Sequence, residues 1–96
     1  MKPSEAFETN RAFIREAVTR HRVANPRIFG SVLHGTDRED SDVDILVDVL
    51  PGATLFDLGG LQADLEDRLG VKVQVLTPGD LHRFYRDRVL AEAQPV

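Results

Sequence analysis

Hydrophobic residues recur along this chain with two different periods, one typical of helices and the other of strands. From about Ser4 to Arg22 they mostly return every three or four residues, with arginines and glutamates between them, which predicts an amphipathic first helix. Five leucines from Leu55 to Leu69 have the same helical spacing, and Gly70 follows in the position that commonly ends a helix. We expect this second helix to turn its leucines toward the core.

Three segments have the features of strands, which are a period-two alternation of apolar residues or a short apolar run after a helix break. They are Arg27–Phe29, Val43–Val49 and Val71–Leu76. Side chains two residues apart on a strand point to the same side of a sheet. Asp42 and Asp44 therefore share one face of the second strand.

A last helix is expected to follow the third strand. Thr77 can cap it, with Pro78 in its first turn. Its apolar face would contain Leu81, Phe84, Val89 and Leu90. Together with a short helix that opens at Ser31, the pattern predicts four helices and three strands in a single domain that spans residues 1–96.

The composition narrows the class of protein. The chain has 96 residues, 42% of them apolar, which suits one compact domain. It contains no cysteine, so a disulfide framework and a cysteine-based zinc site are excluded. Its formal net charge of -4 disfavours direct binding to DNA or RNA, and no apolar stretch approaches the roughly 20 residues that span a bilayer. We expect a cytoplasmic protein whose direct partners include neither a membrane nor a nucleic acid.

The segment from Gly30 to Asp44 carries the candidate chemistry. Two carboxylates on one face, those of Asp42 and Asp44, can ligate a hard cation, and Mg²⁺ commonly binds through one or two carboxylates together with substrate phosphates. Gly30 lets a ligand approach the backbone, and Ser31 can open a short helix whose amides and hydroxyl meet phosphate oxygens. Each feature alone is common in turns and on solvated surfaces, so the prediction of a metal site beside an anion site depends on their combination.

The combination of Gly30-Ser31, ten intervening residues and Asp42-Val43-Asp44 resembles the signature of the nucleotidyltransferases related to DNA polymerase beta. The resemblance is closest to the minimal nucleotidyltransferases of bacteria and archaea, and it extends over nearly the whole chain. It includes the segments Pro51–Leu58, Leu69–Val73 and Arg86–Leu90. It implies an α+β fold, the polymerase beta-like nucleotidyltransferase fold, with a small mixed β-sheet and helices packed mainly on one face.

The resemblance also implies roles for four residues. Gly30 and Ser31 would bind the triphosphate of ATP, and Asp42 and Asp44 would be the catalytic residues that hold magnesium. Minimal nucleotidyltransferases are commonly encoded beside a ribonuclease of the HEPN family, and characterised members transfer AMP from ATP to a tyrosine of that partner. The expected function is therefore that of an antitoxin adenylyltransferase, which silences the toxin within a hetero-oligomeric complex.

The sequence departs from the family pattern at two positions. Gln74 occupies the place of a third carboxylate, and a neutral amide can neither act as a general base nor hold a metal ion as strongly as an aspartate. His34 stands where many relatives have an arginine. Either it stabilises phosphate less than a guanidinium would, or it is an ordinary surface residue. An antitoxin that neutralises its partner by binding alone is therefore the alternative function.

Several charged residues near the motif are expected to be solvated. They are Asp37, Arg38, Glu39 and Asp40 in the loop before the second strand, and Asp48 near the end of that strand. Asp48 has the same nominal face as Asp44, but it lies too far along the strand to replace the missing carboxylate. The cations between His82 and Arg88 are assigned to solvent as well, with a partner surface or substrate phosphates as the alternatives.

Overall fold

A four-stranded sheet in the order β3-β2-β1-β4 forms the centre of the computed structural model, which describes all 96 residues. The strands are β1 (Val23–Phe29), β2 (Val43–Val49), β3 (Val73–Leu76) and β4 (Gln94–Pro95). β1 pairs antiparallel with both β2 and β4, whereas β3 runs parallel to β2 after a helical crossover. The sheet is therefore mixed, and the predicted α+β fold is confirmed.

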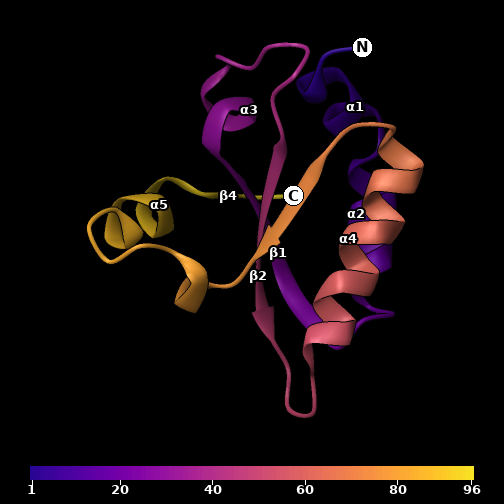
Figure 1. Cartoon of the computed structure of the whole chain (residues 1–96), viewed down its shortest axis with the longest axis vertical. Coiled ribbons are helices and arrows are strands. Elements are labelled where there is room, and N and C mark those ends of the chain that lie inside the picture. The colour runs from indigo at the N-terminus through magenta and orange to yellow at the C-terminus, as the bar shows by residue number, and fades with distance from the viewer.

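The helices cover the two faces of this sheet unequally. They are α1 (Pro3–Thr9), α2 (Arg11–Val18), α3 (Gly30–His34), α4 (Leu55–Leu69) and α5 (Arg86–Glu92), with a 3-10 turn, η1, at Pro78–Asp80. In Figure 1, α1, α2 and α4 lie on one side of the sheet and α5 lies on the other, which confirms that the helices pack mainly on one face. None of the helices is both long enough and apolar enough to cross a membrane.

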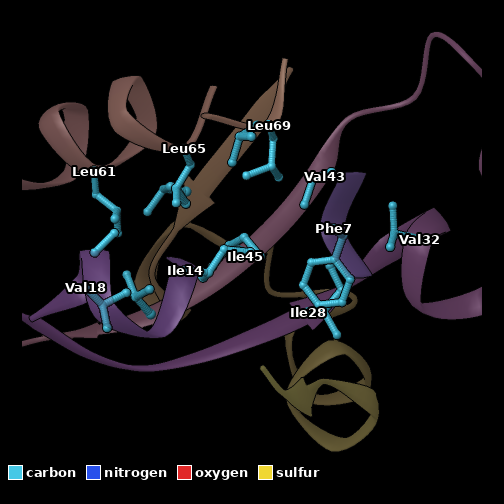
Figure 2. Close-up of a cluster of buried hydrophobic side chains, with 14 of the residues drawn as sticks. Phe7, Ile14, Val18, Ile28, Val32, Val43, Ile45, Leu61, Leu65 and Leu69 are labelled. Carbon is cyan, nitrogen blue, oxygen red and sulfur yellow. The ribbon is translucent and has the colours of Figure 1, made fainter. Parts of the chain in front are cut away.

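The alternation along β2 divides the apolar residues into two clusters. The main cluster of 16 buried residues, part of which is drawn in Figure 2, includes Val43, Ile45, Val47, Leu61 and Leu65. Leu46 points to the opposite face and packs with Phe29 and Leu81 in a smaller cluster. Asp44 and Asp48 flank Leu46 on this second face. The candidate site therefore lies on the side of the sheet away from the main core.

The amphipathic N-terminal segment forms two helices rather than the single helix expected from Ser4 to Arg22. Asn10, with φ -117° and ψ 19°, leaves the helical region between α1 and α2. Its side-chain amide donates a hydrogen bond to Ala6 O at 2.8 Å. Short polar side chains that bond to the backbone in this way favour helix ends over helix interiors, which explains the break.

Strand β1 is longer than the predicted segment Arg27–Phe29. It begins at Val23, and its register against β2 shifts around Asn25-Pro26, where Asn25 has φ +56°. Such a bulge tolerates a residue that lacks a backbone donor, as Pro26 does. The strand therefore continues through a dipeptide that the sequence pattern marks as a break.

Helix α4 begins and ends where the sequence predicts, but its leucine stripe is only partly core. Thr54 caps the helix, and Gly70 ends it in the left-handed conformation with φ +72°. The last three leucines of the stripe are buried, whereas Leu55 is 83% exposed. The start of α4, at Leu55 and Phe56, thus lies outside the core, contrary to the prediction.

Strand β3 begins at Val73 rather than at Val71, and α4 closes its outer edge. Glu66 Oε2 accepts a hydrogen bond from Val73 N at 3.1 Å, and Gln62 Oε1 accepts one from Val75 N at 3.2 Å. Unpaired amides at a sheet edge are a template for another strand. These two side chains therefore remove that template.

The predicted C-terminal helix is divided, and a fourth strand follows it. Thr77 caps only η1, and α5 begins at Arg86 after an intervening turn. Phe84, which is predicted on the apolar face of this helix, is 81% exposed. The two residues of β4 pair with β1, which brings the strands to four and the α-helices to five. Their pairing depends on where α5 returns the chain, so no local pattern indicates it.

Candidate functional site

Asp44 lies near the start of β2 on the second face of the sheet. Its register partners are Phe29 on β1 and Gln74 on β3. Asp42 comes directly before β2, and the amide of Val43 between the two aspartates donates a 2.9 Å hydrogen bond to the segment that leads into β3. Both aspartates are half-buried. The structure therefore brings the predicted pair together on one face, as the period of a strand requires.

Gly30 forms the junction between β1 and α3 and lies directly against Asp44. Its φ of +75° is in the left-handed region that favours glycine. A Cβ atom at this position would collide with Asp44 Oδ2 and would lie 3.2 Å from Asp44 Cγ. Both the backbone conformation and the close approach of the carboxylate therefore require glycine here.

Ser31 follows Gly30 in the first turn of the five-residue helix α3 and is partly buried. Phe29, which precedes the helix in an extended conformation, offers no side-chain acceptor to the first amides of α3. Because the end of β1 pairs with the start of β2, all four residues predicted for the site lie at one end of the sheet. This end is where β1 passes into α3, and Figure 1 shows α3 beside it.

The two carboxylates lie close to each other without a basic partner. Burial, together with the negative charge of Asp42, raises the pKa of Asp44 to about 6. No lysine, arginine or histidine forms an ion pair with either carboxylate. A divalent cation would supply the missing positive charge, and carboxylate oxygens are the hard ligands that Mg²⁺ prefers. These residues therefore fit a magnesium ion that is also bound by substrate phosphates.

Gln74 stands level with Asp44 on the neighbouring strand and is exposed on the same face. A hollow beside it is lined by Asp42, Lys72 and Glu66 among others. The chain contains no group of three or more acidic, histidine or cysteine side chains that could hold a metal ion. The position next to the aspartate pair is thus occupied by a neutral amide, whose oxygen can ligate a cation but carries no charge.

Asp37, which was expected to be solvated, is buried. Only 8% of it is exposed, and its Oδ2 accepts a 2.9 Å hydrogen bond from Ser4 N in the first turn of α1. This hydrogen bond holds the pKa of Asp37 below its ordinary value. Arg38 N donates to Ser41 Oγ at 2.9 Å, so two contacts fix the loop that leads to Asp42. The sequence carries no signal of the first contact, because its partners are 33 residues apart.

Asp48 shares a face with Asp44 but has the basic partner that Asp44 lacks. Its carboxylate accepts hydrogen bonds from Arg27 Nη2 at 2.7 Å and from Asn25 Nδ2 at 3.0 Å. The bond from Asn25, followed by that from Arg27, holds the pKa of Asp48 below its ordinary value. The expectation of a freely solvated residue is therefore wrong, because Asp48 belongs to an ion pair of its own.

The other charged residues around the motif lie at the surface. Arg38, Glu39 and Asp40 are exposed, as expected. His34 is exposed too, and its Nε2 lies 3.1 Å from Glu92 Oε2, which connects the end of α3 to the end of α5. His34 is therefore a surface residue that also connects α3 to α5.

A mixed sheet with an aspartate pair at the start of a central strand, beside a helix that begins with glycine, is the arrangement expected of a nucleotidyltransferase. The sequence model of the family described as nucleotidyltransferase domain matches residues 11–96, so the chain belongs to this family. Within this family, the chain is similar to the minimal nucleotidyltransferases. A solved structure described as a minimal nucleotidyltransferase is 39% identical, with a TM-score of 0.85 over 97% of this chain and 95% of the other.

Curated relatives extend this similarity. A Methanocaldococcus jannaschii protein assigned as a protein adenylyltransferase is 43% identical over 80% of this chain and 83% of its own length. The protein adenylyltransferase MntA of Thermococcus cleftensis is 36% identical over 81% of this chain and 79% of its own length. A toxin-antitoxin structure with AMP-PNP contains a chain that shares the fold, with a TM-score of 0.74 and 19% identity over 90% of this chain and 71% of that one.

Proposed function

We propose that this chain is a magnesium-dependent protein adenylyltransferase that transfers AMP from ATP to a tyrosine of a HEPN-family ribonuclease toxin, and so acts as its antitoxin. The observation that carries the proposal is the pair of carboxylates, Asp42 and Asp44, held beside Gly30 without a basic partner. The relatives named protein adenylyltransferases support a protein acceptor, and the toxin-antitoxin neighbour supports a toxin as that protein.

Two of the four site residues would bind the metal ion, and the other two would bind the nucleotide. Asp42 and Asp44 would hold the magnesium ion, and Gly30 and Ser31 would lie against the triphosphate. When bound, the ion would neutralise phosphate charge and lower the pKa of the acceptor hydroxyl. The tyrosine oxygen forms a bond to the α-phosphorus of ATP. The bond between that phosphorus and the oxygen bridging the α- and β-phosphates breaks, and pyrophosphate leaves. The neutral amide of Gln74 cannot take the hydroxyl proton, so we assign its acceptance to solvent water.

A second function is favoured by one observation, the neutral Gln74 beside Asp44. Without a third carboxylate, the nucleophile-side metal would be held weakly and transfer would be slow. An antitoxin of this kind would neutralise the ribonuclease by binding alone. The two functions differ in whether the inhibited ribonuclease carries a covalent AMP.

Intact mass spectrometry distinguishes these functions directly. The purified chain is incubated with ATP, magnesium and the HEPN-family ribonuclease proposed as its partner, and the mass of the ribonuclease is then measured. The inactive comparison is the double variant Asp42→Ala, Asp44→Ala. The matched control is Asp48→Ala, which removes a carboxylate from the same strand and face but outside the site.

The proposed transfer requires a mass gain in multiples of AMP with the wild type and the Asp48 variant, and none with the double variant. A ribonuclease that is inhibited but unmodified would leave the binding antitoxin. A ribonuclease that is neither modified nor inhibited would refute both functions.

A further inference from the structure

A group of exposed aromatic, arginine and leucine side chains extends from the turn after η1 into α5. We call it the α5 surface, and it consists of His82, Arg83, Phe84, Tyr85, Arg88 and Leu90. Phe84 is 81% exposed, Tyr85 44% and Leu90 37%. Large apolar side chains exposed together on a small protein commonly mark a binding surface.

Contacts within the α5 surface hold its rings in place. The His82 ring lies 4.7 Å from the Phe84 ring and 5.8 Å from the Tyr85 ring, measured between centroids. Arg83 Cζ lies 5.2 Å from the Phe84 centroid, and Phe84 N donates a 3.1 Å hydrogen bond to His82 Nδ1. Rings that are already ordered lose little conformational entropy when a partner covers them. Aromatic and arginine side chains also dominate the energy of protein interfaces.

The α5 surface is attached to the face of the sheet that carries the aspartate pair. Leu81, the residue before it, packs against Phe29 and Leu46. Phe29 is the register partner of Asp44, so this anchor lies beside the site. Arg86 Nη2 donates to Leu81 O at 2.7 Å and ties the start of α5 to the same place. In Figure 1, α5 and α3 lie on the side of the sheet opposite α4.

The charge of this segment differs in sign from that of the whole chain. Between His82 and Leu90 there are three arginines and one aspartate, whereas the chain has a formal net charge of -4. A positive patch on an acidic protein attracts an acidic partner and orients its approach. The ordered rings supply apolar contact in the same place.

We propose that the α5 surface is the docking site for the protein that receives the nucleotidyl group, and that its occupant is a segment of that protein with acidic residues beside apolar ones. This proposal rests on the proposed function, because it places the acceptor protein next to Asp44. Docking at the α5 surface brings the acceptor hydroxyl to the same face of the sheet as the aspartate pair.

A second exposed apolar group provides the matched comparison. Val49, Leu50, Leu55 and Phe56 are all exposed, with Phe56 at 90%. They lie where β2 ends and α4 begins, at the other end of the sheet from α3 in Figure 1. Val49 is five residues beyond Asp44, roughly 17 Å along an extended strand. A partner bound there would be far from the aspartate pair.

Affinity measurements on three double variants test the proposal. The wild type and the variants are titrated, without ATP, into the HEPN-family ribonuclease proposed as the partner. The pair Phe84→Ala, Tyr85→Ala should weaken binding at least about tenfold, whereas Leu55→Ala, Phe56→Ala should change it less than about twofold. Arg83→Glu, Arg88→Glu should weaken binding most at low salt, because it reverses the attraction. ATP binding to each isolated variant should match the wild type, since these side chains are assigned to the protein partner.

Several outcomes would overturn the docking site. They are an equal or larger loss in the Leu55, Phe56 pair, an unchanged affinity in the Phe84, Tyr85 pair, a parallel loss of ATP binding, and the absence of a complex with the wild type. A change in the self-association of the chain alone, with the complex unaffected, would identify a second copy as the occupant instead. A wild type that binds the ribonuclease without adding AMP leaves the docking site standing and removes only the transfer.

Discussion

Replacing Asp44 with asparagine should make the metal-free protein more stable while it abolishes nucleotidyl transfer. Asparagine keeps the shape of the side chain that lies against Gly30 but removes the charge that burial and Asp42 disfavour. Residues shaped for function are often unfavourable for stability, because the ligand that relieves their charge is absent from the free protein. The aspartate pair has this property, since no basic side chain neutralises it.

The magnitude follows from the pKa of Asp44. A rise from the ordinary value of 3.8 to about 6 corresponds to about 3 kcal/mol against the ionised folded state. Asp44 is partly exposed, so solvent screening reduces the expected effect to about 1–2 kcal/mol. We therefore expect Asp44→Asn to raise the free energy of unfolding by this smaller amount at neutral pH.

The sign of the pH dependence is also determined. Between the unfolded pKa near 3.8 and the folded pKa near 6, the folded protein binds more protons, so its stability falls as the pH rises through this window. The advantage of Asp44→Asn should therefore be small near the lower limit, grow across the window, and remain constant above about pH 7.

Urea unfolding in the presence of EDTA, at a series of pH values, measures this difference. The control is Asp48→Asn on the same strand and face. Asp48 is paired with Arg27 and its pKa is lowered, so this variant should lose about 0.5–1 kcal/mol at neutral pH, the opposite sign. If Asp44→Asn is no more stable than the wild type at any pH, the uncompensated charge inferred for the site is refuted.

Three further predictions concern the surroundings of Asp44. Gly30→Ala should lower the free energy of unfolding by at least about 2 kcal/mol in urea titrations, because φ is +75° and the added methyl group meets Asp44. The control Gly70→Ala has a similar φ of +72° but open space around the methyl group, so it should lower the free energy of unfolding by only about 1 kcal/mol. Gln74→Asp should raise the rate of AMP transfer measured by mass spectrometry, and an unchanged rate would show that the third carboxylate is not limiting. Asp37→Asn should be less stable than the wild type at neutral pH, and this difference should vanish as the pH falls below the lowered pKa of Asp37. Equal urea midpoints for the two proteins, at neutral pH as well as at the low pH, would contradict the role of the hydrogen bond from α1 to Asp37.

The predicted elements were most accurate where a single local rule controls the backbone. Strand β2 begins and ends at the predicted residues because alternation of apolar side chains requires one buried face. Helix α4 ends at Leu69 because Gly70 adopts the left-handed conformation that stops a helix. The errors occur where a side chain or a distant strand competes with the local rule, as at Asn10, Pro26 and Phe84.

The candidate site divides in the same way. The spacing of Asp42 and Asp44 and the position of Gly30 before a helix are properties of short segments, so the sequence indicates them directly. The level pairing of Gln74 with Asp44 depends on the register of two strands separated by α4. This register is set by how α4 packs on the sheet, which no short segment contains.

By itself, the sequence determined the type of most strands and helices and the shared face of the aspartate pair, because backbone sterics and side-chain period act over a few residues. The need for glycine at position 30 came in part from the tertiary structure, which places the Asp44 carboxylate against it. The tertiary structure alone decided which charges are compensated. It left the aspartate pair without a basic partner, gave Asp48 to Arg27, buried Asp37 against α1 and exposed the rings of the α5 surface. The physical reason is that desolvation and ion pairing depend on neighbours brought together from distant parts of the chain.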